Sequence, residues 1–130
     1  MTITDIEKQT IGPSVANALR EDIGSGDLTA SLIGADVVSG ATIIARESLL
    51  LCGQAWADEV FAQLDESIVV DWYVTDGQNA ENGDVICKLT GPARALLSGE
   101  RTALNFLQTL SATATATSHY VAAVQGTGAR

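Results

Sequence analysis

Two charged side chains stand next to each other in the stretch GERTALNFL, residues 99–107. Neighbours one apart on a helix point in different directions, so Glu100 and Arg101 need separate explanations. Leucine or alanine follows Glu100 at three, four and seven positions, which puts its carboxylate inside the apolar stripe of the expected helix. A carboxylate there needs a polar partner from elsewhere in the fold. Arg101 has no acidic residue three or four positions away, so its partner also lies elsewhere.

Arginine is the residue suited to an anionic ligand, because its planar guanidinium binds a carboxylate through two parallel hydrogen bonds. The chain has 7 basic against 16 acidic residues and a formal net charge of −9. This balance argues against a nucleic-acid or anionic-membrane surface. An anionic ligand would therefore be held locally, by one or two arginines. From the residues alone, a surface or structural role for Arg101 stays the default interpretation.

The remaining reactive side chains favour structural roles. Cys52 and Cys87 sit in apolar strand-like runs without metal-ligand spacing, which predicts buried free thiols in a cytosolic protein rather than a disulfide. His119, the single histidine, is expected on a helix as a packing or surface residue rather than a catalytic base. The polar N-terminal residues lack an apolar signal core, and no apolar run approaches membrane-spanning length. We therefore expect a soluble, cytoplasmic location.

The first part of the chain predicts a short helix and a turn-rich loop. Pro13 suits a first helical turn, and the amphipathic stretch that follows it ends at Gly24. The loop GSGDLT, residues 24–29, has the glycines of a phosphate-binding loop, but acidic residues crowd it and no lysine follows. We therefore expect a turn in which Asp27 acts as a cap or Asx-type residue.

The middle of the chain, with 46% hydrophobic residues overall, has the patterns of a globular core. In chain order, the expected elements are strand-like runs within 41–53 on both sides of a polar break at 46–48, a helix at 54–65, and strands at 67–77 and 84–91 joined by the Gly/Asn-rich 76–83. This mixture of helices and strands indicates an α+β class.

Beyond Pro92 the chain becomes helical, with Pro92 in a first turn and Gly126 as the stop. SATATATS, residues 111–118, alternates with period two, which by itself allows a strand or a linker. Small side chains also suit a helix that packs closely against something. Tyr120 and Val121 then resume helical spacing.

Four stretches carry a more specific signal: LREDIGSGDLT at 19–29, ARE at 45–47, VTDGQNAENGDVICKLTGPARALLSGERTALNFLQTLS at 74–111, and HYV at 119–121. Together they resemble the quinolinate phosphoribosyltransferase family, the carboxylating nicotinate-nucleotide diphosphorylases. The resemblance runs nearly end to end, and GPARALLSGERTALNFLQTLS is its most specific piece.

The resemblance implies an open α/β sandwich with a hammerhead-like strand arrangement at residues 1–110, including the start of the long helix. Residues 111–130 would begin an α/β barrel domain. Family members continue into a basic strand with a Thr-Arg-Lys-Thr-like run, whereas this sequence stops at Arg130. We therefore expect the N-terminal part of an enzyme, without transferase activity of its own.

The implied reaction joins quinolinate to phosphoribosyl pyrophosphate and gives nicotinate mononucleotide, pyrophosphate and carbon dioxide in NAD biosynthesis. Mg²⁺ is implied with phosphoribosyl pyrophosphate, at ligands outside this chain. Carried over from the family motif, Arg101 holds quinolinate across the interface of a homodimer or higher homo-oligomer. Glu100 is a candidate either to orient a basic residue of the active site or to satisfy a buried helix N-terminus. The resemblance assigns no catalytic residue and no metal ligand to these residues.

One departure and two other hypotheses stay open. Ala112 stands where family members have glycine, which could be harmless or mark a divergent, molybdenum-associated relative with the same fold. A carrier module resembling biotinyl and lipoyl domains would need a modifiable lysine at a hairpin tip, whereas Lys88 is expected inside a strand. A non-catalytic dimerisation unit is the third possibility.

Overall fold

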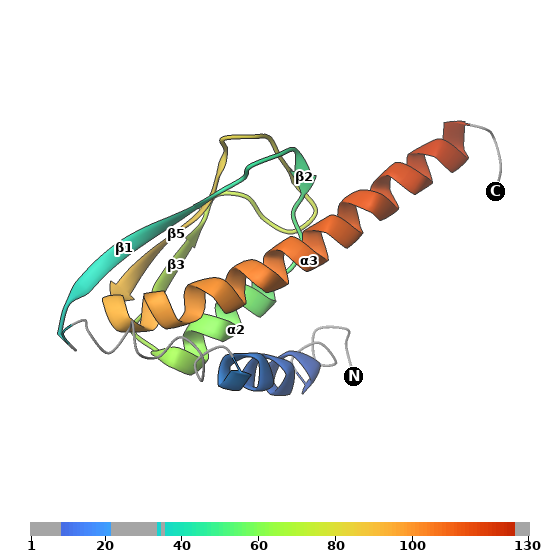
Figure 1. Ribbon diagram of the computed structural model, residues 1–130. Helices are drawn as coiled ribbons and strands as arrows, with labels where there is room; N and C mark the ends of the chain where they lie inside the picture. The colour runs from blue at the N-terminus through green and yellow to red at the C-terminus, as the bar shows by residue number, and fades with distance from the viewer. Residues whose placement is uncertain (1–8, 22–33, 35, 127–130) are drawn as a thin grey trace.

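The computed structural model describes residues 9–21, 34 and 36–126 (Figure 1). In chain order, a helix at 9–21 is followed by β1 (Val38–Ile44), β2 (Leu49–Leu50), α2 (Gln54–Leu64), β3 (Val69–Trp72), β4 (Asn79–Ala80), β5 (Val85–Pro92) and α3 (Ala93–Gly126). The structure confirms the α+β class and the predicted helix at 54–65. It also confirms the polar break between the first two strands.

The main sheet has three antiparallel strands in the order β1-β5-β3. Exposed and buried side chains alternate along these strands. Lys88 of β5 lies opposite Thr42 of β1 and Asp71 of β3, and all three side chains are exposed. Their neighbours Ile43 and Cys87 are buried on the opposite face. Since side chains alternate across a strand, one face of this sheet belongs to the core and the other faces solvent.

The helices α2 and α3 lie on one side of the sheet, and the helix 9–21 packs beyond them (Figure 1). The residues of the buried cluster that come from these elements include Val15 of the first helix, Val60 and Phe61 of α2, Leu89 of β5, and Ala103 and Leu107 of α3. At the crossing of α2 and α3, a Cβ on Gly99 would lie 2.6 Å from Leu64 Cδ1 and 2.9 Å from Phe61 Cε1. Glycine therefore permits this close helix contact.

The stretch 111–118 is part of α3, so the alternatives of a strand or a linker are wrong. Threonine is a weak helix former, but its hydroxyl can bond the carbonyl four residues earlier. Thr113 Oγ1 donates to Thr109 O at 3.1 Å, and Thr115 Oγ1 donates to Ser111 O at 2.7 Å. The helix ends at Gly126, as predicted, and its C-terminal end projects away from the other elements (Figure 1).

Several element boundaries differ from the prediction. The first helix includes residues 9–12, so Pro13 is not at its start. Ile11 extends the buried row of Val15 and Leu19, and this packing accounts for the extra turn. The 67–77 strand is shorter, and β4 forms inside the expected connection by pairing with β2. The predicted stop at Gly24 and the 24–29 loop with Asp27 lie outside the described residues.

Candidate functional site

Arg101 is exposed on α3, directly before the buried residues Thr102 and Ala103, which are 1% and 0% exposed. The side chain therefore points away from the core while its own backbone is anchored in it. Among the described residues, no hydrogen bond or ion pair of Arg101 is found. An arginine on a firmly packed helix, with its donors free, can bind an external carboxylate through its planar fork.

Glu100 is exposed, so the interpretation that its carboxylate lies in the buried stripe is wrong. The stripe is displaced by one position, because it passes through Leu96 and Gly99 while Leu97 is 39% exposed. An exposed carboxylate is hydrated and needs no buried partner. Glu100 also lies seven residues after Ala93, too far inside α3 to satisfy the N-terminus of this helix. Its role in orienting a basic residue stays a prediction.

Two other sequence candidates on α3 face outward. Ala112 is exposed, so the methyl group that replaces the family's glycine adds to the surface and not to a helix crossing. His119 is also exposed and is a surface residue in this structure. A hollow of about 450 Å³ between α3 and residues 47–49 includes both side chains in its lining.

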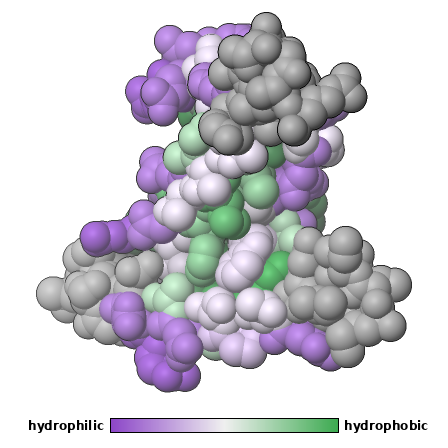
Figure 2. All heavy atoms as spheres, turned by 90° about the vertical axis from the view of Figure 1, so that its right-hand side faces the viewer, coloured by the Kyte–Doolittle hydropathy of each residue, from purple (hydrophilic) through white to green (hydrophobic). Residues whose placement is uncertain are grey.

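An apolar hollow of about 340 Å³ lies beside the arginine-bearing turn. Trp56 of α2 and Phe106 of α3 form part of its wall, with their ring centroids 5.0 Å apart. Asn105, four residues after Arg101, also lines it. Figure 2, viewed from the end at which α3 projects, shows pale and apolar surface in the middle of this face between polar side chains.

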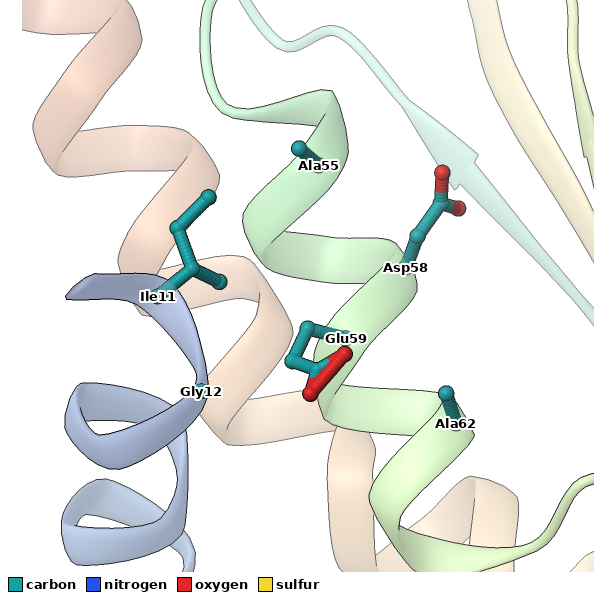
Figure 3. Close-up of a pocket in the computed structure, with 6 residues that line it drawn as sticks. All are labelled: Ile11, Gly12, Ala55, Asp58, Glu59 and Ala62. Atoms are coloured by element: carbon teal, nitrogen blue, oxygen red, sulfur yellow. The ribbon is translucent and has the colours of Figure 1, made fainter. Parts of the chain in front are cut away.

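A further hollow, of about 420 Å³, separates the first helix from α2 (Figure 3). Its two charged residues are Asp58 and Glu59, and both have structural partners. Glu59 Oε1 accepts from Gln63 Nε2 at 3.2 Å, and the same nitrogen donates to Gly12 O at 2.9 Å. Two carboxylates make this hollow unsuitable for an anionic substrate.

The charge of Asp58, an exposed residue of α2, acts on the buried thiol of Cys87. Asp58 Oδ1 accepts from Trp72 Nε1 at 2.8 Å. Partial burial raises the pKa of the Asp58 carboxyl; the indole hydrogen bond lowers it and the nearby Asp76 raises it further. Burial, with the charge of Asp58, raises the pKa of the Cys87 thiol to about 12. Such a thiol is not a nucleophile at neutral pH.

Neither cysteine forms a disulfide within the described residues, as predicted; Cys87 is buried and Cys52 half-buried. Lys88 lies within β5, between β1 and β3, and its Nζ is 5.4 Å from the centre of the Tyr73 ring. A carrier lysine stands at a hairpin tip, so this position disfavours the carrier hypothesis.

Two further features are absent from the described residues, a metal-binding cluster and a membrane-spanning helix. No three histidine, cysteine, aspartate or glutamate side chains in this part of the chain come together in a group that could hold a metal ion. No described helix has the length and apolar character needed to span a membrane.

Comparison with known proteins gives one consistent family. The model of the quinolinate phosphoribosyl transferase N-terminal domain matches residues 27–111. A probable carboxylating nicotinate-nucleotide pyrophosphorylase of Bacillus subtilis is 44% identical over 97 residues, which are 75% of this chain and 34% of that protein. A mitochondrial decarboxylating quinolinate phosphoribosyltransferase 2a of Nicotiana tabacum is 40% identical over 102 residues, 77% of this chain and 29% of its own length.

The fold gives the same result. The structure of the nicotinate-nucleotide pyrophosphorylase from Francisella tularensis superposes with a TM-score of 0.84 and 41% identity, over 89% of this chain and 41% of that one. The chain belongs to the quinolinate phosphoribosyltransferase family and corresponds to its N-terminal domain. It spans about a third of the length of these two curated relatives, at 34% and 29%.

Proposed function

We propose that the protein containing these residues is a quinolinate phosphoribosyltransferase, which converts quinolinate and phosphoribosyl pyrophosphate into nicotinate mononucleotide, pyrophosphate and carbon dioxide in NAD biosynthesis. The observation that carries this proposal is the family match over 27–111, which includes the intact GERTALNFL motif. The relatives described above are named for this chemistry, and none of them favours the molybdenum-associated alternative.

Within this reaction we assign substrate binding to Arg101. Quinolinate is a rigid dicarboxylate, and a guanidinium held on a packed helix can fix one carboxylate in position and orientation. The exposed position of Arg101, without a partner among the described residues, supports a ligand outside its own domain. That ligand is quinolinate in the pocket of another subunit, so the active form is a homodimer or a higher homo-oligomer.

The other chemical groups come from outside the described residues. We propose that Mg²⁺ binds together with phosphoribosyl pyrophosphate, at ligands that this part of the chain does not supply. Glu100 is proposed to orient a basic residue of the active site from its exposed position beside Arg101. We expect no transferase activity from the 130 residues alone. We further propose a cytoplasmic location, in keeping with the bacterial relatives; a plant relative is named mitochondrial.

The test is an assay of the complete protein encoded by the gene, with quinolinate and phosphoribosyl pyrophosphate as substrates and nicotinate mononucleotide as the product measured. Arg101→Ala should raise the KM for quinolinate at least about tenfold, because a charge-assisted pair is lost, with little change in the KM for phosphoribosyl pyrophosphate. Arg46→Ala, at an exposed arginine without an assigned role, is the control.

Each possible result tests a different part of the proposal. A complete wild-type protein that forms no nicotinate mononucleotide would contradict the proposed reaction. Equal losses for both substrates in Arg101→Ala would contradict the role of Arg101 while the reaction itself stands. Steady product formation by the purified 130-residue chain would mean that this domain holds catalytic groups that we have not assigned.

A further inference from the structure

Two hydroxyl groups attach α3 to the segment that contains β2. Ser111 Oγ accepts from Cys52 N at 3.0 Å and donates to Cys52 O at 3.1 Å. Thr115 Oγ1 accepts from Leu50 N at 2.9 Å. We call these two side chains and their backbone partners the hydroxyl latch. Ser111 is 3% exposed, so at least this half of the latch is shielded from competing water.

The latch takes the place of a neighbouring strand. Alternate residues of a strand direct their backbone groups to opposite edges. Leu51 bonds toward β4, where its N–H donates to Gln78 O and its carbonyl accepts from Gly77 N, both at 2.9 Å. Leu50 and Cys52 therefore face α3. Residues two apart in a strand are about 6.8 Å apart and residues four apart in a helix about 6 Å, so Ser111 and Thr115 match this edge.

A buried apolar row of α3, which contacts α2, β1 and β5, fixes this helix to the body of the domain. Two close attachments along α3 are the crossing of α2 at Gly99 and the hydroxyl latch. Arg101 lies between these two places, two residues after the crossing. Beyond Thr115 the helix projects away from the other elements (Figure 1). The direction of α3 relative to the sheet is therefore set jointly by the apolar row, which includes the crossing, and by the latch.

We propose that Ser111 and Thr115 are positioning residues for Arg101, because the latch fixes the angle at which α3 leaves the domain. This inference rests on the proposed function, in which Arg101 enters the pocket of another subunit. With the latch open, α3 could tilt about the Gly99 crossing. A tilt of about 5° moves the far end of the helix by about 3–4 Å over about 40 Å.

Such a tilt changes the placement of the whole domain relative to anything that α3 connects to. The curated relatives are more than twice as long as this chain, so in a protein of that length α3 joins this domain to the residues beyond it. A shift of about 1 Å in the reach of Arg101 is enough to weaken a carboxylate contact that depends on orientation. The effect falls on quinolinate, since only quinolinate is held by Arg101.

The experiment compares three threonine variants in the complete enzyme. Thr115→Val removes the hydroxyl and keeps the branched shape, while Thr115→Ser keeps the hydroxyl. Thr113→Val is the matched control, because Thr113 is exposed and its hydroxyl bonds only the preceding turn, at Thr109 O, in the hydrogen bonds given for it. We expect Thr115→Val to raise the KM for quinolinate about three- to tenfold, with kcat and the KM for phosphoribosyl pyrophosphate within about twofold of wild type. Thr115→Ser and Thr113→Val should resemble wild type.

Hydrogen exchange at the Leu50 amide reports on the latch independently of activity. Faster exchange in Thr115→Val, together with the selective rise in KM and its rescue in Thr115→Ser, supports the inference. Faster exchange with a quinolinate KM equal to that of Thr113→Val overturns the positioning role and leaves the proposed reaction intact. Unchanged exchange overturns the latch itself. If the wild-type enzyme forms no nicotinate mononucleotide, both the proposed function and the positioning role that rests on it are contradicted.

Discussion

The two halves of α3 are held by different forces. Residues 93–110 bury an apolar row that includes Leu96, Ala103 and Leu107, and this row packs against α2 and the sheet. None of residues 112–119 is buried. From Ser111 onward, the hydroxyls of Ser111 and Thr115 attach the helix to the domain through hydrogen bonds. One continuous helix thus passes from a region fixed by apolar packing to one fixed by polar contacts.

This difference gives the two parts of α3 different structural roles. Apolar packing is strong and non-directional, so it fixes the first half of α3 firmly in the core. Hydrogen bonds between a helix and a strand edge are individually weaker but depend on distance and angle. The first half therefore supplies stability to the turn that bears Arg101, and the second half supplies direction. The following substitutions test this division.

The largest effect is expected at Leu107, which is 4% exposed in the packed half. Leu107→Ala should lower the free energy of unfolding by about 2–5 kcal/mol, because it removes buried methyl groups and leaves a cavity. Leu97→Ala, on the same helix at 39% exposure, should cost much less. Urea denaturation of both variants measures this, and similar losses would mean that burial does not distinguish these faces of α3.

The crossing of α2 and α3 gives an intermediate effect. Gly99→Ala should destabilise the domain, because overpacking costs about 1–3 kcal/mol against a helix-propensity gain of up to about 1 kcal/mol. Gly12→Ala is the matched control, since a Cβ there would come no closer than 3.8 Å, to Glu59 Oε1. We expect Gly12→Ala to be neutral or stabilising in thermal unfolding. If Gly99→Ala leaves the stability unchanged, the side chains of Phe61 and Leu64 can shift to accommodate the added methyl group at little cost.

The sequence allowed the packed half to be predicted and left the polar half open. Apolar spacing of 3.6 residues identified α2, and β-branched runs identified β3 and β5, because burial selects these patterns directly. The same spacing wrongly placed Glu100 in the buried stripe, because the true stripe lies one residue earlier along the helix. Whether Leu96 or Leu97 faces the core is decided by the Gly99 crossing, which is a tertiary contact. A helical pattern alone leaves this choice undetermined.

Polar contacts between distant segments were missed for a related reason. The strand β4 has two residues in a polar connection and exists because β2 lies beside it. In the sequence, Ser111 and Thr115 belong to a run that alternates with period two. In the structure, their contacts follow the helical spacing of four residues. Serine and threonine occur in turns, strands and helices alike. The role of Arg101 and the domain division after residue 110 stay predictions; α3 continues through that position without a break.

The smallest expected effect lies at Asp58, an exposed residue of α2 whose carboxylate accepts a hydrogen bond from Trp72 of β3. Its pKa is raised above the ordinary value of 3.8, mainly by partial burial. A carboxyl with a raised folded-state pKa contributes stability that is fully present below its unfolded-state pKa and is lost as the pH rises through the folded-state pKa. Asp58→Asn removes this loss and keeps an oxygen that can accept from Trp72 Nε1.

At neutral pH, Asp58→Asn should therefore be more stable than wild type, by less than about 1 kcal/mol because the group is largely solvent-screened. The difference should shrink as the pH falls toward the ordinary carboxyl pKa, where wild-type Asp58 is itself protonated. Urea denaturation across this pH range measures it, with Asp71→Asn, at an exposed aspartate of β3, as the control. A variant that is less stable at every pH would instead show that the charged carboxylate matters for the indole bond. In that case hydrogen bonding, and not burial, dominates even in the region that apolar packing holds together.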